Sequence, residues 1–97
     1  MNLESRQIED IQRFFSSQPV KKAYIFGSFG KNTANAESDI DILVDLDYTK
    51  KIGLGFIQMK LDLEEILGRN VVVVSTKGIS KYIKPIVDKE KLLIYER

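Results

Sequence analysis

Two short polar sequences contain the groups of this chain that are best suited to chemistry. Gly27-Ser28 follows the apolar run KKAYIF. A glycine there lets the backbone approach a ligand, the following amides can point at a phosphate, and a serine hydroxyl can bond a phosphate oxygen. Asp39 and Asp41 lie two apart in a strand-like sequence, so their carboxylates share one face about 7 Å apart along the backbone. Two such carboxylates can converge on magnesium, with phosphate and water as the other ligands.

Each sequence also has a simpler interpretation when it is taken alone. Asp39 and Asp41 would suit the solvated start of a strand, and Gly27-Ser28 would suit an ordinary turn with a serine cap. The combination is harder to explain in this way, because the second predicted strand brings both acids to the end of the sheet where the Gly-Ser turn lies. The pair of sequences therefore predicts a site for a metal ion and a phosphate.

The loop between these sequences is not a phosphate-binding P-loop. Only two residues separate Gly27 from Gly30, and Asn32 follows Lys31 where a P-loop has Ser or Thr. Lys31 could still contact a phosphate, but a lysine in a loop is more simply expected to face solvent.

The composition narrows the chemistry further. The chain has 97 residues, which predicts one domain over residues 1–97. Lys plus Arg is 15 and Asp plus Glu is 14, so the net charge of +1 gives no argument for binding nucleic acid or an anionic membrane. There is no cysteine and no histidine, which excludes disulfides, His-ligated zinc and a Ser-His-Asp triad. The polar N-terminal sequence and the absence of a long apolar run predict a cytoplasmic protein.

Hydrophobic periodicity predicts the elements that must position these residues. Helices are expected over 3–17 and 54–67, and a helical pattern from Ile79 is interrupted at Pro85. Strands are expected at KKAYIFG, DIDILVDL and NVVVVS, the last of them buried, and LLIY is an apolar tail. The sequence does not decide whether a short helix follows Gly27. The fold class is α/β (α+β), a small mixed sheet with helices packed on it.

One side of the helix over 54–67 is predicted to face the core, and Gly68 is predicted to cap the helix. The residues expected on that side are Phe56, Met59, Leu63, Ile66 and Leu67.

The sequence GSFGKNTANAESDIDILVDL resembles the signature of the minimal nucleotidyltransferases, the small members of the DNA polymerase β-like superfamily. The signature of that family is Gly-Ser, a spacer of about this length, then Ser-Asp-x-Asp and an apolar strand. The resemblance continues through LEEILGRNVVVVS and LLIYE, so it covers nearly the whole chain. It implies the nucleotidyltransferase fold.

The resemblance also implies roles for the four residues. Gly27 and Ser28 would bind the triphosphate, and Asp39 and Asp41 would ligate Mg²⁺ (or Mn²⁺). Such enzymes transfer a nucleoside monophosphate from ATP or another NTP to an acceptor hydroxyl and release pyrophosphate. Small members often act as antitoxins that modify a HEPN-type ribonuclease with AMP, so a HEPN-type protein partner is implied. The acceptor, the nucleotide preference and a homodimer are left open.

One family residue is missing. The family presents a third carboxylate on the next strand, where it helps to bind a metal and to deprotonate the acceptor hydroxyl. In GRNVVVVS that position is Val72, which can neither ligate a metal nor accept a proton. Loss of a general base commonly costs about 10²–10⁴ in rate. Lys31 and Asn32 also replace an arginine and a glycine that are common in this loop.

The remaining acids near the predicted strands are assigned no part in the site. Asp62, Glu64 and Glu65 are expected on a solvated helix face, and Asp45 and Asp47 at a polar exit from the second strand.

Two functional hypotheses follow from these observations. In the first, the protein is a magnesium-dependent nucleotidyltransferase. In the second, it is a nucleotide-binding module with weak or lost catalysis that acts by docking on a partner. The intact Asp39 and Asp41 favour the first hypothesis, whereas Val72 favours the second. A purely structural domain would leave the coincidence of the two polar sequences unexplained.

Overall fold

A computed structural model describes residues 3–30, 35 and 38–97 of the chain. In these residues helices and strands alternate, beginning with a helix. The elements are α1 (Ser5–Phe15), β1 (Val20–Phe26), α2 (Gly27–Gly30), β2 (Ile40–Leu46), α3 (Gly55–Leu67), β3 (Val71–Ser75), α4 (Lys84–Glu90) and β4 (Leu92–Glu96). The short helix considered after the Gly-Ser turn is therefore present as α2.

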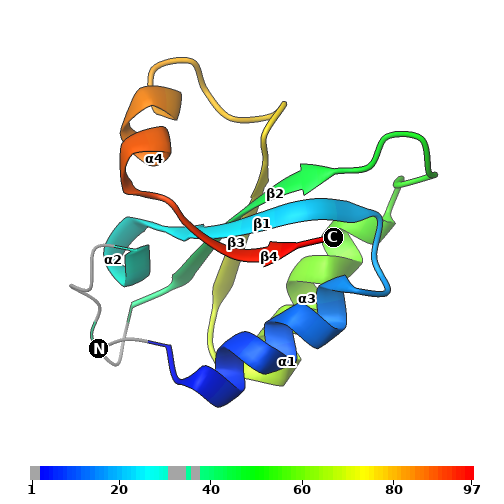
Figure 1. Ribbon diagram of the computed structural model, residues 1–97, viewed down its shortest axis with the longest axis horizontal. Coiled ribbons are helices and arrows are strands. Elements are labelled where there is room, and N and C mark those ends of the chain that lie inside the picture. The colour runs from blue at the N-terminus through cyan, green and yellow to red at the C-terminus, as the bar shows by residue number, and fades with distance from the viewer. Residues whose placement is uncertain (1–2, 31–34, 36–37) are drawn as a thin grey trace.

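The four strands form one mixed sheet in the order β3-β2-β1-β4. β1 is antiparallel to β2 and to β4, whereas β2 and β3 run parallel. Helices α1 and α3 lie on one side of this sheet and α4 lies on the other, with α2 at the end of β1 (Figure 1). The predicted fold class, a small mixed sheet with helices packed on it, is confirmed.

The core lies between the sheet and the pair α1 and α3. Ile40, Ile42 and Val44 alternate along β2 and are fully buried, because every second side chain of a strand points to the same face. Phe15 of α1 and Leu63 of α3 are also fully buried in this cluster. The opposite phase of β2, which contains Asp41 and Asp45, therefore points to the α4 side of the sheet.

Helix α3 differs in one residue from the face predicted for it. Met59, Leu63 and Leu67 are buried at a spacing of four, and Gly68 caps the helix with φ of 64°. Ile66 is 42% exposed, because it lies beside Phe14 of α1 at a surface hollow rather than in the core under the sheet. The prediction that Ile66 faces the core is wrong.

The C-terminal third of the chain also departs from its predicted pattern. β3 is an edge strand, and although Val71 is buried, Val72 is 39% exposed, so the strand is not buried throughout. Pro85 stands in the first turn of α4 and begins that helix instead of interrupting it, because the first turn needs no proline N–H. The apolar tail is β4, which pairs with the otherwise open edge of β1. No helix in the described part of the chain is long and apolar enough to cross a membrane.

Candidate nucleotide and metal site

The Gly-Ser turn and the second aspartate meet in the structure. Gly27 has φ of +69°, a left-handed conformation that favours glycine. A Cβ atom built on Gly27 would overlap the Asp41 Oδ2 atom and lie 3.2 Å from its Cγ atom. Gly27 is therefore required both by its backbone angle and by the space that the Asp41 carboxylate occupies. The structure brings the two predicted sequences into contact.

The two aspartates lie on the α4 side of the sheet but differ in burial. Asp41 lies within β2 and is partly buried, whereas Asp39 directly precedes the strand and is exposed. Burial raises the pKa of the Asp41 carboxyl, and the neighbouring charge of Asp39 raises it further. The two residues are two apart in the chain and so share one face of the strand, where their like charges repel each other. A cation between the carboxylates would relieve this repulsion.

The strand register places Val72 directly beside Asp41. In the antiparallel pair Asp41 lies opposite Phe26, and in the parallel pair it lies opposite Val72. Residues opposite each other in adjacent strands share a face, so Val72 points to the same side as Asp41. Its 39% exposure shows that this position is open to solvent. The sequence placed Val72 on the next strand but did not settle which face its side chain occupies, and the register shows that it is the face of Asp41.

Arg69 binds two backbone carbonyl groups that precede Asp39 in the chain. Its Nη1 donates hydrogen bonds to the carbonyl oxygens of Asn35 and Ser38, both at 3.0 Å. Its guanidinium carbon lies 5.2 Å from the centroid of the Phe29 ring in α2. Arg69 thus touches both halves of the site from the turn before β3. Arg69 is not among the site residues predicted from the sequence, and nothing in the sequence indicates its carbonyl partners.

Ser38 also organises this segment. The Asn35 N–H donates to the Ser38 hydroxyl at 3.0 Å, and the Ser38 N–H donates to the Asn35 carbonyl at 3.1 Å. The side chain of Ser28 and the residues Lys31 and Asn32 lie outside the part of the chain that the structure describes.

Two of the acids that were assigned no part in the site have structural partners. Glu64 accepts hydrogen bonds from Lys60 Nζ at 2.9 Å and from the Val71 N–H at 3.1 Å, and so connects α3 to the start of β3. Both contacts lower the pKa of Glu64, the lysine being the larger cause. Asp47, which directly follows β2, is 7% exposed and accepts from Thr49 and Arg97, so this end of the strand is polar but buried.

The donor set of the site fits one magnesium ion. Two carboxylates that repel each other supply the hard oxygen ligands that Mg²⁺ prefers, and phosphates and water commonly complete its shell. Within residues 3–30, 35 and 38–97, no group of three or more acidic, His or Cys side chains could hold a metal. Asp39 and Asp41 would therefore hold the ion without a third protein carboxylate.

Sequence comparison assigns the chain to a family. The family described as "Polymerase beta, Nucleotidyltransferase" matches residues 9–97. A candidate protein adenylyltransferase of Methanocaldococcus jannaschii is 42% identical over 65 residues, which cover 67% of this chain and 69% of that protein. The protein adenylyltransferase MntA of Thermococcus cleftensis is 32% identical over 75 residues, which cover 77% and 75% of the two chains.

Solved structures share the same fold. A structure of a candidate minimal nucleotidyltransferase has a TM-score of 0.77 at 26% identity and covers 90% of this chain and 88% of its own. A toxin-antitoxin structure with AMP-PNP has a TM-score of 0.76 at 22% identity, covering 98% and 75%. A tri-AMPylated HEPN toxin in complex with its MNT antitoxin, from Shewanella oneidensis, gives 0.75 at 18% identity, covering 98% and 74%.

These matches define the class as the polymerase β-like nucleotidyltransferases, and they agree with the Gly-Ser turn and the aspartate pair. Within that class, the chain belongs to the minimal nucleotidyltransferases and is related to the protein adenylyltransferases.

Proposed function

We propose that this protein binds a nucleoside triphosphate with magnesium and transfers AMP from ATP to a hydroxyl group of a HEPN-type partner, as an antitoxin. The contact between Gly27 and Asp41 is the observation that supports this most strongly, because it joins the turn that would bind the phosphates to a carboxylate that would bind the ion. Relatives named protein adenylyltransferases, and the AMPylated HEPN toxin in a complex of the same fold, support AMP as the transferred group.

The residues of the chain divide the work of this reaction. Gly27 and Ser28 would hold the phosphates, and Asp39 and Asp41 would hold the ion. Magnesium, when bound, supplies positive charge that offsets the charge of the phosphates. The acceptor oxygen forms a bond to the α-phosphorus while the bond from that phosphorus to the bridging oxygen breaks, and pyrophosphate leaves with the electron pair. The hydroxyl proton passes to water, since Val72 offers no acceptor for it.

A second candidate function is favoured by one observation. Val72 lies beside Asp41 on the open face, at the position where the family presents its third carboxylate. If catalysis has been lost, the protein would bind the nucleotide and neutralise its partner by docking alone. The two candidates share a nucleotide site and differ only in whether AMP is transferred.

Calorimetry with ATP, in the presence and absence of magnesium, tests the shared site. The expected result is binding that needs Mg²⁺ or Mn²⁺ and that is lost in the Asp39→Asn/Asp41→Asn double variant. Asp62→Asn is a matched control, since Asp62 on α3 interacts with Gln58 and not with the site. Equal affinity in EDTA, or in the double variant, would refute the proposed metal site.

Incubation with the partner and labelled ATP separates the two candidates. Covalent AMP on the partner, seen by mass spectrometry, is expected for the transferase. Neutralisation of the partner with no AMP attached would establish the docking module instead.

A further inference from the structure

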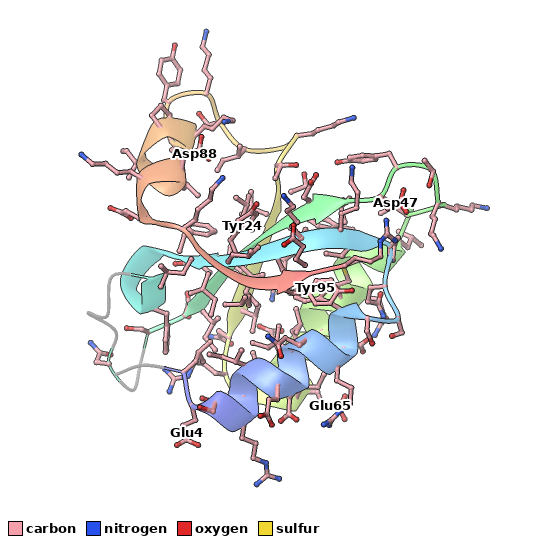
Figure 2. The ribbon with its side chains drawn as sticks, in the orientation of Figure 1. Glu4, Tyr24, Asp47, Glu65, Asp88 and Tyr95 are labelled. Carbon is pink, nitrogen blue, oxygen red and sulfur yellow. The ribbon has the colours of Figure 1, made fainter. Side chains whose placement is uncertain are left out.

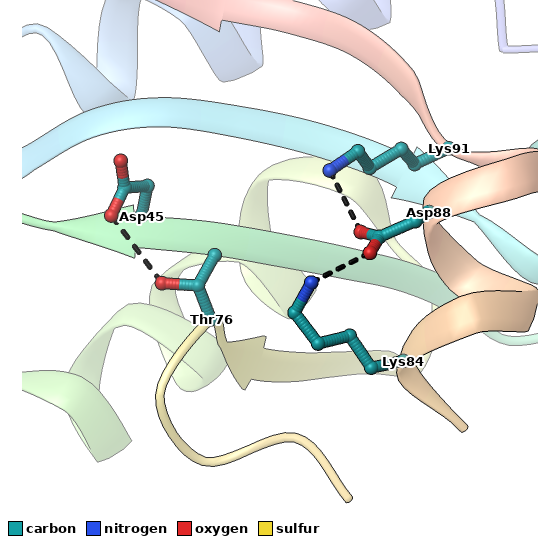
Figure 3. Close-up of polar contacts among 5 residues, drawn as sticks. All are labelled: Asp45, Thr76, Lys84, Asp88 and Lys91. Atoms are coloured by element: carbon teal, nitrogen blue, oxygen red, sulfur yellow. Dashed lines mark hydrogen bonds and ion pairs between the residues drawn. The ribbon is translucent and has the colours of Figure 1, made fainter. Parts of the chain in front are cut away.

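Lys84 of α4 and Lys91, directly after that helix, share the carboxylate of Asp88. Lys84 Nζ lies 2.7 Å from Asp88 Oδ2, and Lys91 Nζ lies 2.9 Å from Asp88 Oδ1. The spacing of four and three residues places all three on one side of the helix. Figure 3 shows Lys84 and Asp88 projecting from α4, and Lys91 from the segment after it, over the side of the sheet where Asp45 meets Thr76. One carboxylate balances only one of the two ammonium groups, so the cluster retains a positive charge.

The strand register locates this cluster relative to the aspartates. Lys91 Nζ lies 4.6 Å from the centroid of the Tyr24 ring, and Tyr24 lies opposite Leu43. Figure 2 shows Tyr24 on the α4 side of the sheet. Leu43 is two residues after Asp41 in β2 and points to the same face. Ordinary spacings along and between strands therefore put the Cα atoms of Tyr24 and Asp41 about 8 Å apart. The lysine pair is thus within reach of phosphates that extend from the aspartate site.

A purely structural role does not account well for this arrangement. The side chain of Lys84 is 56% exposed and that of Asp88 is 36% exposed, and ion pairs with this exposure contribute little to stability. Helix α4 is already attached through Val87, which is 2% exposed. The apolar hollow of about 320 Å³ between Leu3, Phe29 and Leu92 includes Ile25 of the core face, so it offers no alternative site beside Asp41.

We propose that Lys84 and Lys91 bind the β- and γ-phosphates of the nucleoside triphosphate held at Asp39 and Asp41. Asp88 keeps the two ammonium groups over the sheet until the phosphates take its place. The inference rests on the proposed function, because it needs a triphosphate at the aspartates. It assigns phosphate binding to α4, an element outside the Gly-Ser and Asp-x-Asp sequences. Lysine suits this role because its ammonium donates three charged hydrogen bonds to phosphate oxygens.

Calorimetry with MgATP and with AMP on the whole protein tests the pair. Lys84→Gln and Lys91→Gln are each expected to weaken MgATP binding by about tenfold or more, since a charged hydrogen bond is lost. AMP, which has no β- or γ-phosphate, should bind the variants and the wild type alike. Lys89→Gln is the matched control: it removes the same charge from the same helix but lies outside the Asp88 cluster, and its MgATP affinity should stay within about twofold of wild type.

Asp88→Asn is expected to change the MgATP affinity in the opposite direction. Without the carboxylate the lysines are released to the phosphates, so MgATP should bind several-fold more tightly. If Asp88 only stabilised the helix, its loss would leave the affinity unchanged or lower it. Lys91→Arg, which keeps the charge, should retain most of the affinity. Thermal unfolding of each variant shows that the protein is folded, and little change is expected because both lysine side chains are at least 28% exposed.

The outcomes separate this inference from the proposed function. MgATP affinity that survives in the Lys84→Gln/Lys91→Gln variant but is lost in Asp39→Asn/Asp41→Asn would overturn the role of α4 and leave the proposed function standing. An absence of MgATP binding by the wild-type protein would overturn both.

Discussion

At the scale of single residues, the site depends on the close approach of a glycine to a carboxylate. Gly27 has a positive φ and leaves no room for a Cβ atom beside Asp41. Asp41 in turn lies between Phe26 and Val72 in the sheet, so three strands set its surroundings. Small changes at either position are therefore expected to act on nucleotide binding through the geometry of the carboxylate.

Gly27→Ala should disturb both the fold and the site. A left-handed conformation costs an ordinary residue about 1–2 kcal/mol of unfolding free energy, and the new methyl group must displace the Asp41 carboxylate. Gly53→Ala is the control, because Gly53 has φ of +46° with no atom within 4 Å of the added Cβ. Denaturant unfolding should show a loss in both variants, whereas calorimetry should show weaker MgATP binding only for Gly27→Ala. Unchanged binding in Gly27→Ala would contradict the assigned role of this contact.

Val72→Asp should restore the third carboxylate at little cost to stability. Because Val72 is 39% exposed, the new charge stays solvated, and the expected loss is about 1 kcal/mol from strand propensity. AMP transfer to the partner should become faster by about tenfold or more if the carboxylate acts as a base. Val72→Asn, of nearly the same shape but without a charge, should not accelerate transfer. Rapid multiple turnover by the wild type would show that the reaction does not need a carboxylate at position 72.

At the scale of elements, the site is formed where β1 ends and β2 begins, at the same end of the sheet. β1 ends at Phe26 directly before the Gly27 turn, and β2 begins directly after Asp39. The turn between α3 and β3 supplies Arg69, which binds the carbonyl oxygens of Asn35 and Ser38. Helix α4 lies over the same face and contacts α2. The helices α1 and α3 take no direct part, since they cover the other face.

At the scale of the whole molecule, Asp47 joins distant parts of the chain. It follows β2, its N–H donates to the Pro19 carbonyl at 2.8 Å, and its carboxylate accepts from Arg97 at 2.8 Å. Figure 2 shows Asp47 at the end of the sheet away from α4. The hydrogen bonds from the Thr49 hydroxyl and then from Arg97 hold the pKa of Asp47 well below its ordinary value of 3.8.

This depressed pKa predicts acid sensitivity. Folding stabilises the ionised form of Asp47, so its contribution is complete above the ordinary value of 3.8 and is lost as pH falls towards the folded-state pKa. Asp47→Asn should therefore lower Tm at pH 7 and make the fall of Tm below about pH 4 shallower. Asp62→Asn serves as the control on α3. Circular dichroism melts from pH 7 to pH 2 measure this, and parallel acid profiles for wild type and Asp47→Asn would disprove the linkage.

The sequence by itself determined most of the elements and the chemical character of the site. Alternation in DIDILVDL specified which phase of β2 would carry the acids, and the spacing from Gly-Ser to Asp-x-Asp was sufficient to indicate the family. These features are local, because a strand's two faces and a turn's glycine are set by a few neighbouring residues. The resemblance also pointed to Val72 as the position of the missing third carboxylate on the next strand, whereas its pairing with Asp41 comes from the strand register.

Only the tertiary structure decided the features that depend on distant partners. The exposure of Val72 follows from the edge position of β3, and the strand state of LLIY follows from the open edge of β1. Asp47 is buried and forms an ion pair with Arg97, which is far away in the sequence. The location of Lys84 and Lys91 also depends on the fold. The sequence does not show that α4 lies over the sheet face that carries Asp41.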